Sequence, residues 1–332
     1  MVKCLNSFYL PSGRIFLLDL GNGYPVECTE MRDVSTEGKE HQEVRSSNDP
    51  HVIWNHLKPY EEKWLLTVST QMGCPHKCKF CDVPSLQFKG NLTQGEIEDQ
   101  IRFIIEATPY VTKCKKVKIG FARMGEPAHN IENVIGAMIN LESISRFYGK
   151  DFQWLPCFNT ILPVFVMGDF TGIQVLDSVL NLKEEFFDGN LHLQISCNST
   201  DEKVRKDLFG GAEVVPIKDI VKYINDRPLH NRTATLNFIV MKGVPVDVNE
   251  LMGYGLNPEK FTVKLIPLNT TIRSKDNKLE TYANYDNYEK LQELGEEFKK
   301  HGIPIVVDSI AKCEEAGLCC GQLAQVFVKK NV

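Results

Sequence analysis

A short cysteine motif constrains this chain more than any other feature of its sequence. Cys74, Cys78 and Cys81 form a C-x3-C-x2-C pattern that directly follows an apolar, strand-like run. Cysteine thiolates are the ligands of iron–sulfur clusters, and a cubane cluster contains four irons. Three cysteines therefore leave one iron open to another ligand. The alternative is a structural zinc site in which His76 or a distant residue supplies the fourth ligand.

The composition excludes several classes of protein. At 332 residues, 42% of them hydrophobic, the chain is neither disordered nor fibrous and can bury a full core. No apolar run reaches the roughly 20 residues of a membrane span, and the first residues lack a signal peptide's apolar stretch, so we expect a cytoplasmic protein. The net charge of −5 argues mildly against a polyanionic partner. An ordinary solvated face is the simplest interpretation of the basic stretch at Lys113, Lys115, Lys116 and Lys118.

The eleven cysteines do not suggest a disulfide framework, because no secretion signal accompanies them. Three lie within 74–81 and three more within 313–320, while the others are scattered. A scattered cysteine is by itself most simply a small buried hydrophobe. The two groups therefore matter more than the total.

A strand–helix alternation begins at Lys63. The expected strands lie at 64–70, 117–122, 153–159, 191–197, 233–241, 262–267 and 303–307. Capping boxes predict helix starts at Thr93, with Glu96, and at Ser199, with Glu202, and an amphipathic stretch at 285–301 predicts another helix. Such alternation indicates an α/β fold with a parallel sheet and helices outside it. Six repeats favour a partial (β/α)6 TIM-type barrel, although a doubly wound sheet has the same periodicity.

The first part of the chain differs from the rest. Segments 14–20 and 24–31 read as two strands around a Gly21-Asn22-Gly23 turn, and the polar stretch 33–50 reads as a loop. We therefore divide the chain into three parts. These are a short β-rich N-terminal extension (1–62), a core barrel (63–310) and a C-terminal tail (311–332).

Polar side chains follow several predicted strands at their carboxyl ends, where the active site of a barrel lies. Gly125 and Glu126 follow the second strand, the segment 196–198 ends the fourth, and Asn269 follows the sixth. S-adenosylmethionine (SAM) suits an iron with an open position, because its amino and carboxylate groups can chelate the metal. Glu126 suits the SAM ammonium, and the Ser and Asn side chains suit its carboxylate and hydroxyls. Each of these residues could instead merely cap a loop or a helix.

These motifs resemble the RlmN/Cfr group of radical-SAM proteins. The resemblance rests on STQMGC (69–74), CPHKCKFC (74–81), ARMGEPAHN (122–130), LIPLN (265–269) and CCGQLA (319–324). Members methylate an adenine of large-subunit ribosomal RNA, and some also act on transfer RNA. The resemblance therefore implies the radical-SAM partial barrel, a 4Fe-4S cluster on the three cysteines, SAM, an rRNA or tRNA partner and a flavodoxin- or ferredoxin-type electron donor.

The resemblance also implies a role for individual residues. Cys320, in the CGQL segment, matches the cysteine that takes a methyl group from a first SAM. A radical from a second SAM then removes a hydrogen from that methyl, and the carbon adds to adenine, at carbon 2. Glu27 matches a glutamate assigned as a proton acceptor. Matches to SAM contacts are Gly125, Glu126, Cys157, Ser196, Asn198 and Asn269, although the family usually has Ser at the Cys157 position and His at the Asn198 position.

Two departures from the family pattern leave the reaction open. Thr67 stands where the family has a second essential cysteine, which resolves the protein–RNA adduct by forming a disulfide with the methyl-carrying cysteine. A hydroxyl cannot do this, although Cys319 or Cys313 could substitute. The family also carries an amino-terminal accessory domain that helps to grip RNA, and we expect this chain to keep only the last strands of that domain. The alternatives are a radical-SAM enzyme with another substrate or non-methylating chemistry, and a non-catalytic zinc-binding protein.

Overall fold

A computed structural model describes residues 2–33, 56–168, 170–282, 289–307 and 320–331. Ten strands form one sheet in the order β1-β2-β3-β4-β7-β8-β9-β10-β11-β12. Their bounds are β1 Lys3–Leu10, β2 Gly13–Asp19, β3 Pro25–Arg32, β4 Trp64–Val68, β7 Lys113–Phe121, β8 Asp151–Thr160, β9 His192–Ser196, β10 Ala234–Val240, β11 Phe261–Pro267 and β12 Ile305–Val307. A separate ribbon pairs β5 (Gln71–Met72) with β6 (Gly90–Asn91).

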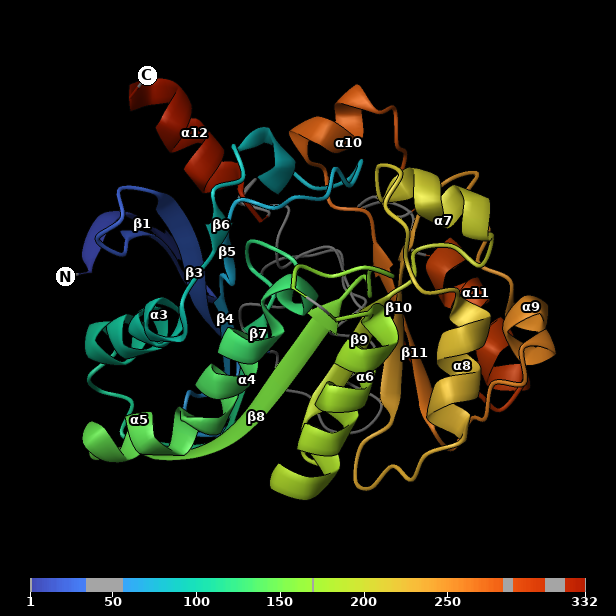
Figure 1. Cartoon of the computed structure of the whole chain (residues 1–332), viewed down its shortest axis with the longest axis horizontal. Helices are drawn as coiled ribbons and strands as arrows, with labels where there is room; N and C mark the ends of the chain where they lie inside the picture. The colour runs from blue at the N-terminus through green and yellow to red at the C-terminus, as the bar shows by residue number, and fades with distance from the viewer. Residues whose placement is uncertain (1, 34–55, 169, 283–288, 308–319, 332) are drawn as a thin grey trace.

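The direction of the strands changes once along this sheet. β1 to β4 pair antiparallel, whereas every neighbouring pair from β4 to β12 is parallel. The parallel strands follow one another in chain order, while a doubly wound sheet would reverse its order at a switch point. The predicted α/β fold with a parallel sheet is therefore confirmed, and its winding is that of a barrel (Figure 1). The division into three parts stays a prediction.

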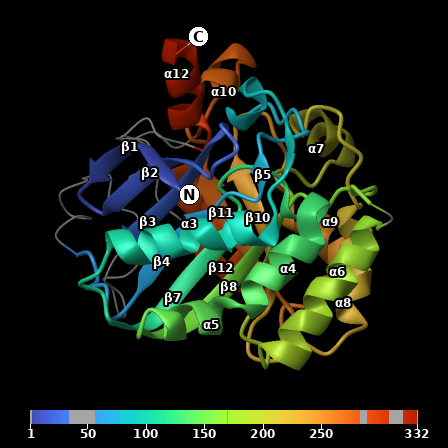
Figure 2. The same ribbon diagram turned by 60° about the vertical axis from the view of Figure 1, so that its left-hand side comes forward.

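Most of the helices cover the outside of this sheet, whereas α10 and α12 lie together beyond one end of the strands (Figure 2). They are α3 Gln94–Ala107, α4 Ile131–Ile139, α5 Leu141–Phe147, α6 Gly172–Asn181, α7 Glu202–Leu208, α8 Ile217–Asn225, α9 Val248–Gly253, α10 Ile272–Asp276, α11 Glu289–Lys300 and α12 Gln322–Asn331, with short 3-10 turns η1 Val83–Ser85 and η2 Pro127–Asn130. In α3 the buried residues Ile97, Ile101, Ile104 and Ile105 recur at helical spacing and pack into the main core. No helix in the described ranges is long and apolar enough to cross a membrane.

The expected strands are confirmed with shifts of a few residues at their ends, and β1 is an additional strand. β1 was missed because most of its side chains are exposed or half-buried, which leaves little alternation of apolar and polar residues. The predicted turn at 21–23 is confirmed, since the Asp19 carboxylate accepts from the amides of Gly21 and Gly23, each at 2.9 Å. The predicted loop at 33–50 falls, after Asp33, outside the described residues.

One of the two predicted capping boxes is wrong. Thr93 and Glu96 cap α3 reciprocally, as predicted. At α7, however, the cap is Asp201, whose carboxylate accepts from the amides of Lys203 and Val204. Ser199 instead donates to the carbonyl of Pro245. The carboxylate of Asp201 lies next to the helix start and satisfies two free amides at once, so the hydroxyl two residues earlier is displaced.

Candidate active site

A cavity of about 180 Å³ lies at the carboxyl ends of the parallel strands, and we call it the cysteine cavity. Eight of the eleven predicted site residues line it, namely Cys74, Cys78, Cys81, Gly125, Glu126, Ser196, Asn198 and Cys320. Glu27, Cys157 and Asn269 do not line it. The cavity therefore joins segments that are up to 246 positions apart in the sequence, from Cys74 to Cys320.

The loop that carries the three cluster cysteines is held by neighbouring elements. Arg273 of α10 donates to the carbonyls of Cys78 (3.2 Å) and Lys77 (3.0 Å). The Lys79 amide donates to the carbonyl of Leu208, at the end of α7 (2.9 Å). The loop is thereby anchored between two helices through its backbone, which leaves the cysteine side chains directed to the cavity.

The environment of the three thiols is apolar. Burial raises the pKa of Cys74 to about 12, and it raises the pKa values of Cys78 and Cys81 as well. Such thiols stay protonated unless a metal centre displaces the proton. Within the described part of the chain, no group of three or more His, Cys, Asp or Glu side chains is arranged to hold a single metal ion.

His76, the nearest candidate for a fourth zinc ligand, is engaged elsewhere. Its Nε2 lies 2.8 Å from Nε2 of His129, and the two rings stack with centroids 4.8 Å apart. Burial lowers the pKa of both imidazoles to about 4, so both are neutral near pH 7. Of this neutral pair, His76 lines the cavity.

Glu126 is a buried carboxylate with a full set of protein donors. It accepts from the amides of Ala128 (3.1 Å) and Ile161 (3.0 Å) and from the hydroxyl of Thr160. Burial nevertheless raises its pKa to about 7, because these neutral donors do not offset the loss of water. A cation in the cavity would stabilise the ionised form.

Gly125 is required by the turn that presents Glu126. Its φ is +98°, and an added Cβ would lie 2.6 Å from the Cβ of Gln71. The Gln71 side chain in turn accepts from the Glu126 amide at 2.8 Å. The backbone of the Gly-Glu-Pro segment therefore packs against the Gln71 side chain at the edge of the cavity.

Asn198 provides an open hydrogen-bond donor. Its Oδ1 accepts from the amide of Ile239 at 3.1 Å, while its buried Nδ2 has no hydrogen-bond partner among the described residues. Asn198 also adopts a left-handed conformation, with φ +62°. A buried donor on a cavity wall is satisfied when a ligand supplies an acceptor. The three thiols, Glu126 and this donor together fit a cluster with a bound amino acid derivative such as SAM.

Cys320 reaches the cavity from the C-terminal segment. Arg123 Nη1 lies 3.6 Å from its Sγ, and Arg123 Nη2 lies 2.7 Å from the carboxylate of Glu27. Glu27 is fully buried and accepts from the amides of Gly321 (3.0 Å) and Ala324 (2.9 Å). Glu27 thus caps the start of α12 and holds the segment next to Cys320 against the barrel.

Arg123 and Asp82 are two residues at the site that no sequence motif predicted. Asp82 is buried directly after the last cluster cysteine and accepts from Gln322 of the CGQL segment (3.0 Å) and from the Arg273 amide (2.9 Å). The only available signal was position, because Arg123 precedes Met-Gly-Glu-Pro and Asp82 follows Cys81. Both side chains connect the cysteine motif or the Gly-Glu-Pro segment to the C-terminal segment.

Other predicted residues lie outside the cavity lining. The Sγ of Cys157 is 3.1 Å from Asn159 and 3.4 Å from His192, farther inside the barrel. Asn269 is half-buried after β11. The Thr67 hydroxyl pairs with that of Thr29 at 2.6 Å. Cys313 and Cys319 lie outside the described residues.

This chain is similar in sequence to several RNA methyltransferases. A probable dual-specificity RNA methyltransferase RlmN of Chlorobaculum tepidum is 28% identical over 211 residues, which are 62% of this chain and 52% of that protein. Dual-specificity RNA methyltransferases RlmN of Campylobacter hominis and Helicobacter hepaticus are 28% and 29% identical over 81% and 82% of this chain, and the matches cover 69% and 68% of those proteins. No family model matches.

The fold also has a relative among solved structures. A radical SAM methyltransferase from Sphaerobacter thermophilus superposes with a TM-score of 0.65 over 97% of this chain and 80% of that one, at 18% identity. That likeness concerns the fold. The chain spans about half the length of the first curated relative it matches. In sequence this chain is thus similar to RlmN RNA methyltransferases, and in fold it is similar to a radical SAM methyltransferase.

Proposed function

We propose that this chain is a radical-SAM RNA methyltransferase that methylates an adenine carbon, at carbon 2 of an rRNA or tRNA adenosine, through Cys320. The observation that carries the proposal is that Cys320 lines the same cavity as Cys74, Cys78 and Cys81. The names of the relatives supply the RNA substrate class.

The cofactors in this proposal are a 4Fe-4S cluster on the three cysteines and SAM. When bound, they supply one-electron cleavage of the sulfonium, with an electron from a flavodoxin- or ferredoxin-type donor. The residues of the chain bind and orient these two cofactors. Glu126 would pair with the SAM ammonium, which brings the pKa of this carboxyl back below about 7. Ser196 and Asn198 would donate to the SAM carboxylate or hydroxyls.

Cys320 is the proposed methyl carrier. Its thiol has to face both the cofactor and the RNA base, and Arg123 donates to its Sγ while Glu27 holds the helix that follows. Both carboxylate oxygens of Glu27 are occupied, Oε2 by Gly321 together with Arg123 and Oε1 by Ala324. As a proton acceptor it would first have to give up one of these donors.

A second candidate function follows from Thr67. Its hydroxyl is bonded to Thr29 and offers no sulfur for a disulfide with Cys320. The alternative is a radical-SAM enzyme of the same fold that acts on another substrate or does not methylate. Mass spectrometry of total RNA from cells with and without the gene distinguishes the two, because only the RNA methyltransferase leaves a methyladenosine that disappears with the gene.

The direct test uses the full chain, reconstituted with iron and sulfide without oxygen. With methyl-labelled SAM and candidate RNAs, Cys320→Ala is expected to retain iron and 5′-deoxyadenosine release but to lose label in RNA. Cys74→Ala is expected to lose iron, and Cys4→Ala, an exposed cysteine far from the cavity in sequence, is the matched control. Labelling of RNA by Cys320→Ala at the wild-type rate would refute the proposal.

A further inference from the structure

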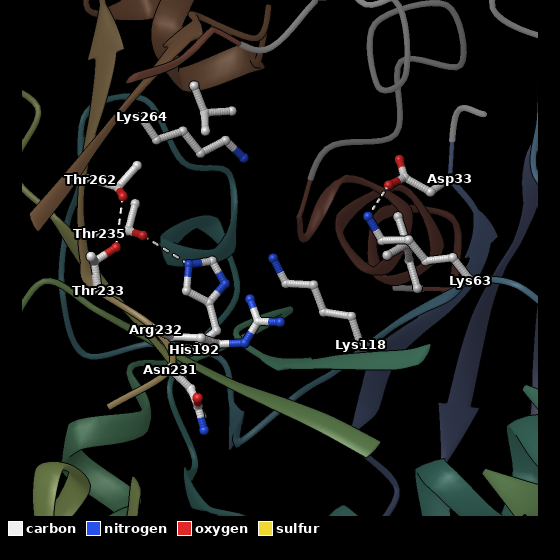
Figure 3. Close-up of a pocket in the computed structure, with 12 residues that line it drawn as sticks. Asp33, Lys63, Lys118, His192, Asn231, Arg232, Thr233, Thr235, Thr262 and Lys264 are labelled. Atoms are coloured by element: carbon white, nitrogen blue, oxygen red, sulfur yellow. Dashed lines mark hydrogen bonds and ion pairs between the residues drawn. The ribbon is translucent and has the colours of Figure 1, made fainter. Parts of the chain in front are cut away.

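A second cavity, of about 500 Å³, lies inside the barrel toward the amino ends of the strands, and we call it the basic cavity. Its walls come from β4, β7, β9, β10, β11 and β12, from residues just before β4 and β10, and from Asp33 directly after β3 (Figure 3). Cys157 lies between the two cavities, since it contacts Asn159 of the cysteine cavity and His192 of the basic cavity. The basic cavity is thus separate from the site described above.

Cations dominate the lining of this cavity. Lys63, Lys118, Arg232 and Lys264 all contribute, and Asp33 is the one carboxylate on the lining among the described residues. Asp33 pairs with Lys63. Figure 3 shows the charged ends of Lys118, Arg232 and Lys264 directed into the same space from three strands or strand ends. Among the described residues, four cations and one carboxylate line this cavity, although the chain as a whole has a net charge of −5.

The pKa of His192 reflects the positive electrostatic potential in this cavity. Its pKa is lowered to about 2, by burial first and then by Lys118, Lys264 and Arg232. The imidazole is therefore neutral at working pH, and it bonds the Thr235 hydroxyl at 2.9 Å. A cavity lined by several cations of one sign attracts anions into it.

The polar groups on the wall match the oxygens of such an anion. The Nε of Arg232 is buried and has no hydrogen-bond partner within the described ranges. The hydroxyls of Thr233 and Thr262 lie 2.7 Å apart on the same wall. Guanidinium, ammonium and hydroxyl donors together bind oxyanions. A volume of about 500 Å³ lies in the range of small-molecule sites.

We propose that the basic cavity binds a phosphorylated small molecule of nucleotide size through Lys118, Arg232 and Lys264, at the end of the barrel opposite the cysteine cavity. A phosphate group suits the site better than a single carboxylate, because it carries close to two negative charges and three acceptor oxygens. The walls are strands of the barrel itself, which leaves room for a small molecule rather than for a nucleic-acid duplex. The proposal does not depend on the proposed methyltransferase activity.

Binding is tested by calorimetry on the full chain without iron or SAM, with inorganic pyrophosphate and adenosine 5′-monophosphate as probes. Lys118→Gln and Arg232→Gln are each expected to weaken binding about 10- to 100-fold, the range for losing one charged hydrogen bond. Lys218→Gln, which removes the same charge from an exposed position on α8, is the matched control.

Further measurements show whether the variants fold normally and whether the bound phosphate belongs to a small molecule or to RNA. Without ligand, Lys118→Gln is expected to melt at or above the wild-type temperature because it relieves repulsion, whereas a merely structural lysine would lower it. The probes are expected to raise the melting temperature of the wild type and of Lys218→Gln only. Equal affinity in the cavity variants and the control, or no saturable binding of either probe, overturns the proposal. Binding of a single-stranded RNA that depends on Arg232, without binding of the two probes, overturns it as well and assigns the site to an RNA backbone.

Discussion

Replacing Glu27 by Gln tests how the C-terminal segment is held against the barrel. The carboxylate is fully buried, lies 2.7 Å from Arg123 and accepts from the amides of Gly321 and Ala324. The amide keeps the shape of the side chain but removes its charge and one acceptor. Breaking a buried ion pair on one side costs about 3 to 5 kcal/mol. We expect about 3 kcal/mol, because Arg123 retains its contact with Cys320.

The assay is urea unfolding of the cofactor-free chain, where about 3 kcal/mol corresponds to roughly a 100-fold larger unfolding equilibrium constant. Arg123→Met leaves Glu27 as the uncompensated partner, and the double variant removes both charges. We expect the double variant to be about 2 kcal/mol more stable than the sum of the single effects predicts. Hydrogen exchange at the amides of Gly321 and Ala324 is expected to accelerate in Glu27→Gln.

A matched control lies on the same strand. Glu30 is equally buried and pairs with Arg14 at 2.6 Å, away from the C-terminal segment. Glu30→Gln is expected to lower stability without accelerating exchange at Gly321, and to combine additively with Arg123→Met. If the effects of Glu27→Gln and Arg123→Met add within about 0.5 kcal/mol, the carboxylate does not hold the segment through this ion pair and the reasoning fails.

Gly321→Ala is expected to weaken the packing of the C-terminal segment, because φ at Gly321 is +84° and the new Cβ would come within 2.8 Å of the Val83 backbone. Hydrogen exchange in α12 at the wild-type rate would contradict this. The pKa of Glu126 is raised from 4.5 to about 7 by burial, so the folded chain holds a proton that the unfolded chain releases. The contribution of Glu126 to the free energy of unfolding of the cofactor-free chain should therefore be greatest below about pH 4.5 and should fall by ~3 kcal/mol as the pH rises to 7 and above. Urea unfolding at several pH values measures this decrease, and Glu126→Gln should abolish it. Thr67→Val is expected to cost about 1 kcal/mol by leaving the Thr29 hydroxyl without its partner, and a smaller cost in the Thr29→Val/Thr67→Val double variant checks the pairing.

Local signals predicted most of the fold. Alternating apolar residues gave the parallel strands, and the reciprocal side chains of Thr93 and Glu96 predicted the start of α3. At α7 the same pattern failed, because Asp201 offered a stronger acceptor closer to the helix. The winding order required the structure, since periodicity does not tell which strands are neighbours.

The candidate site was predictable where its residues belong to a recognisable sequence motif. The cysteines and the Gly-Glu-Pro segment each fall at a strand end, and they line one cavity. Arg123 could not be assigned, because its partners Glu27 and Cys320 lie 96 positions before it and 197 after it. Lys118 was interpreted as part of a solvated face, but strand alternation turns it into the barrel, where it lines the basic cavity.

The bond between Glu27 and Gly321 spans 294 positions of the sequence. During synthesis the loop that carries the cluster cysteines emerges from the ribosome well before the C-terminal segment that packs against it. Non-local contacts of this kind form late because a long loop must close first. The growing chain consequently passes through a period in which Cys74, Cys78 and Cys81 are already translated while the cavity wall that contains Cys320 is still missing.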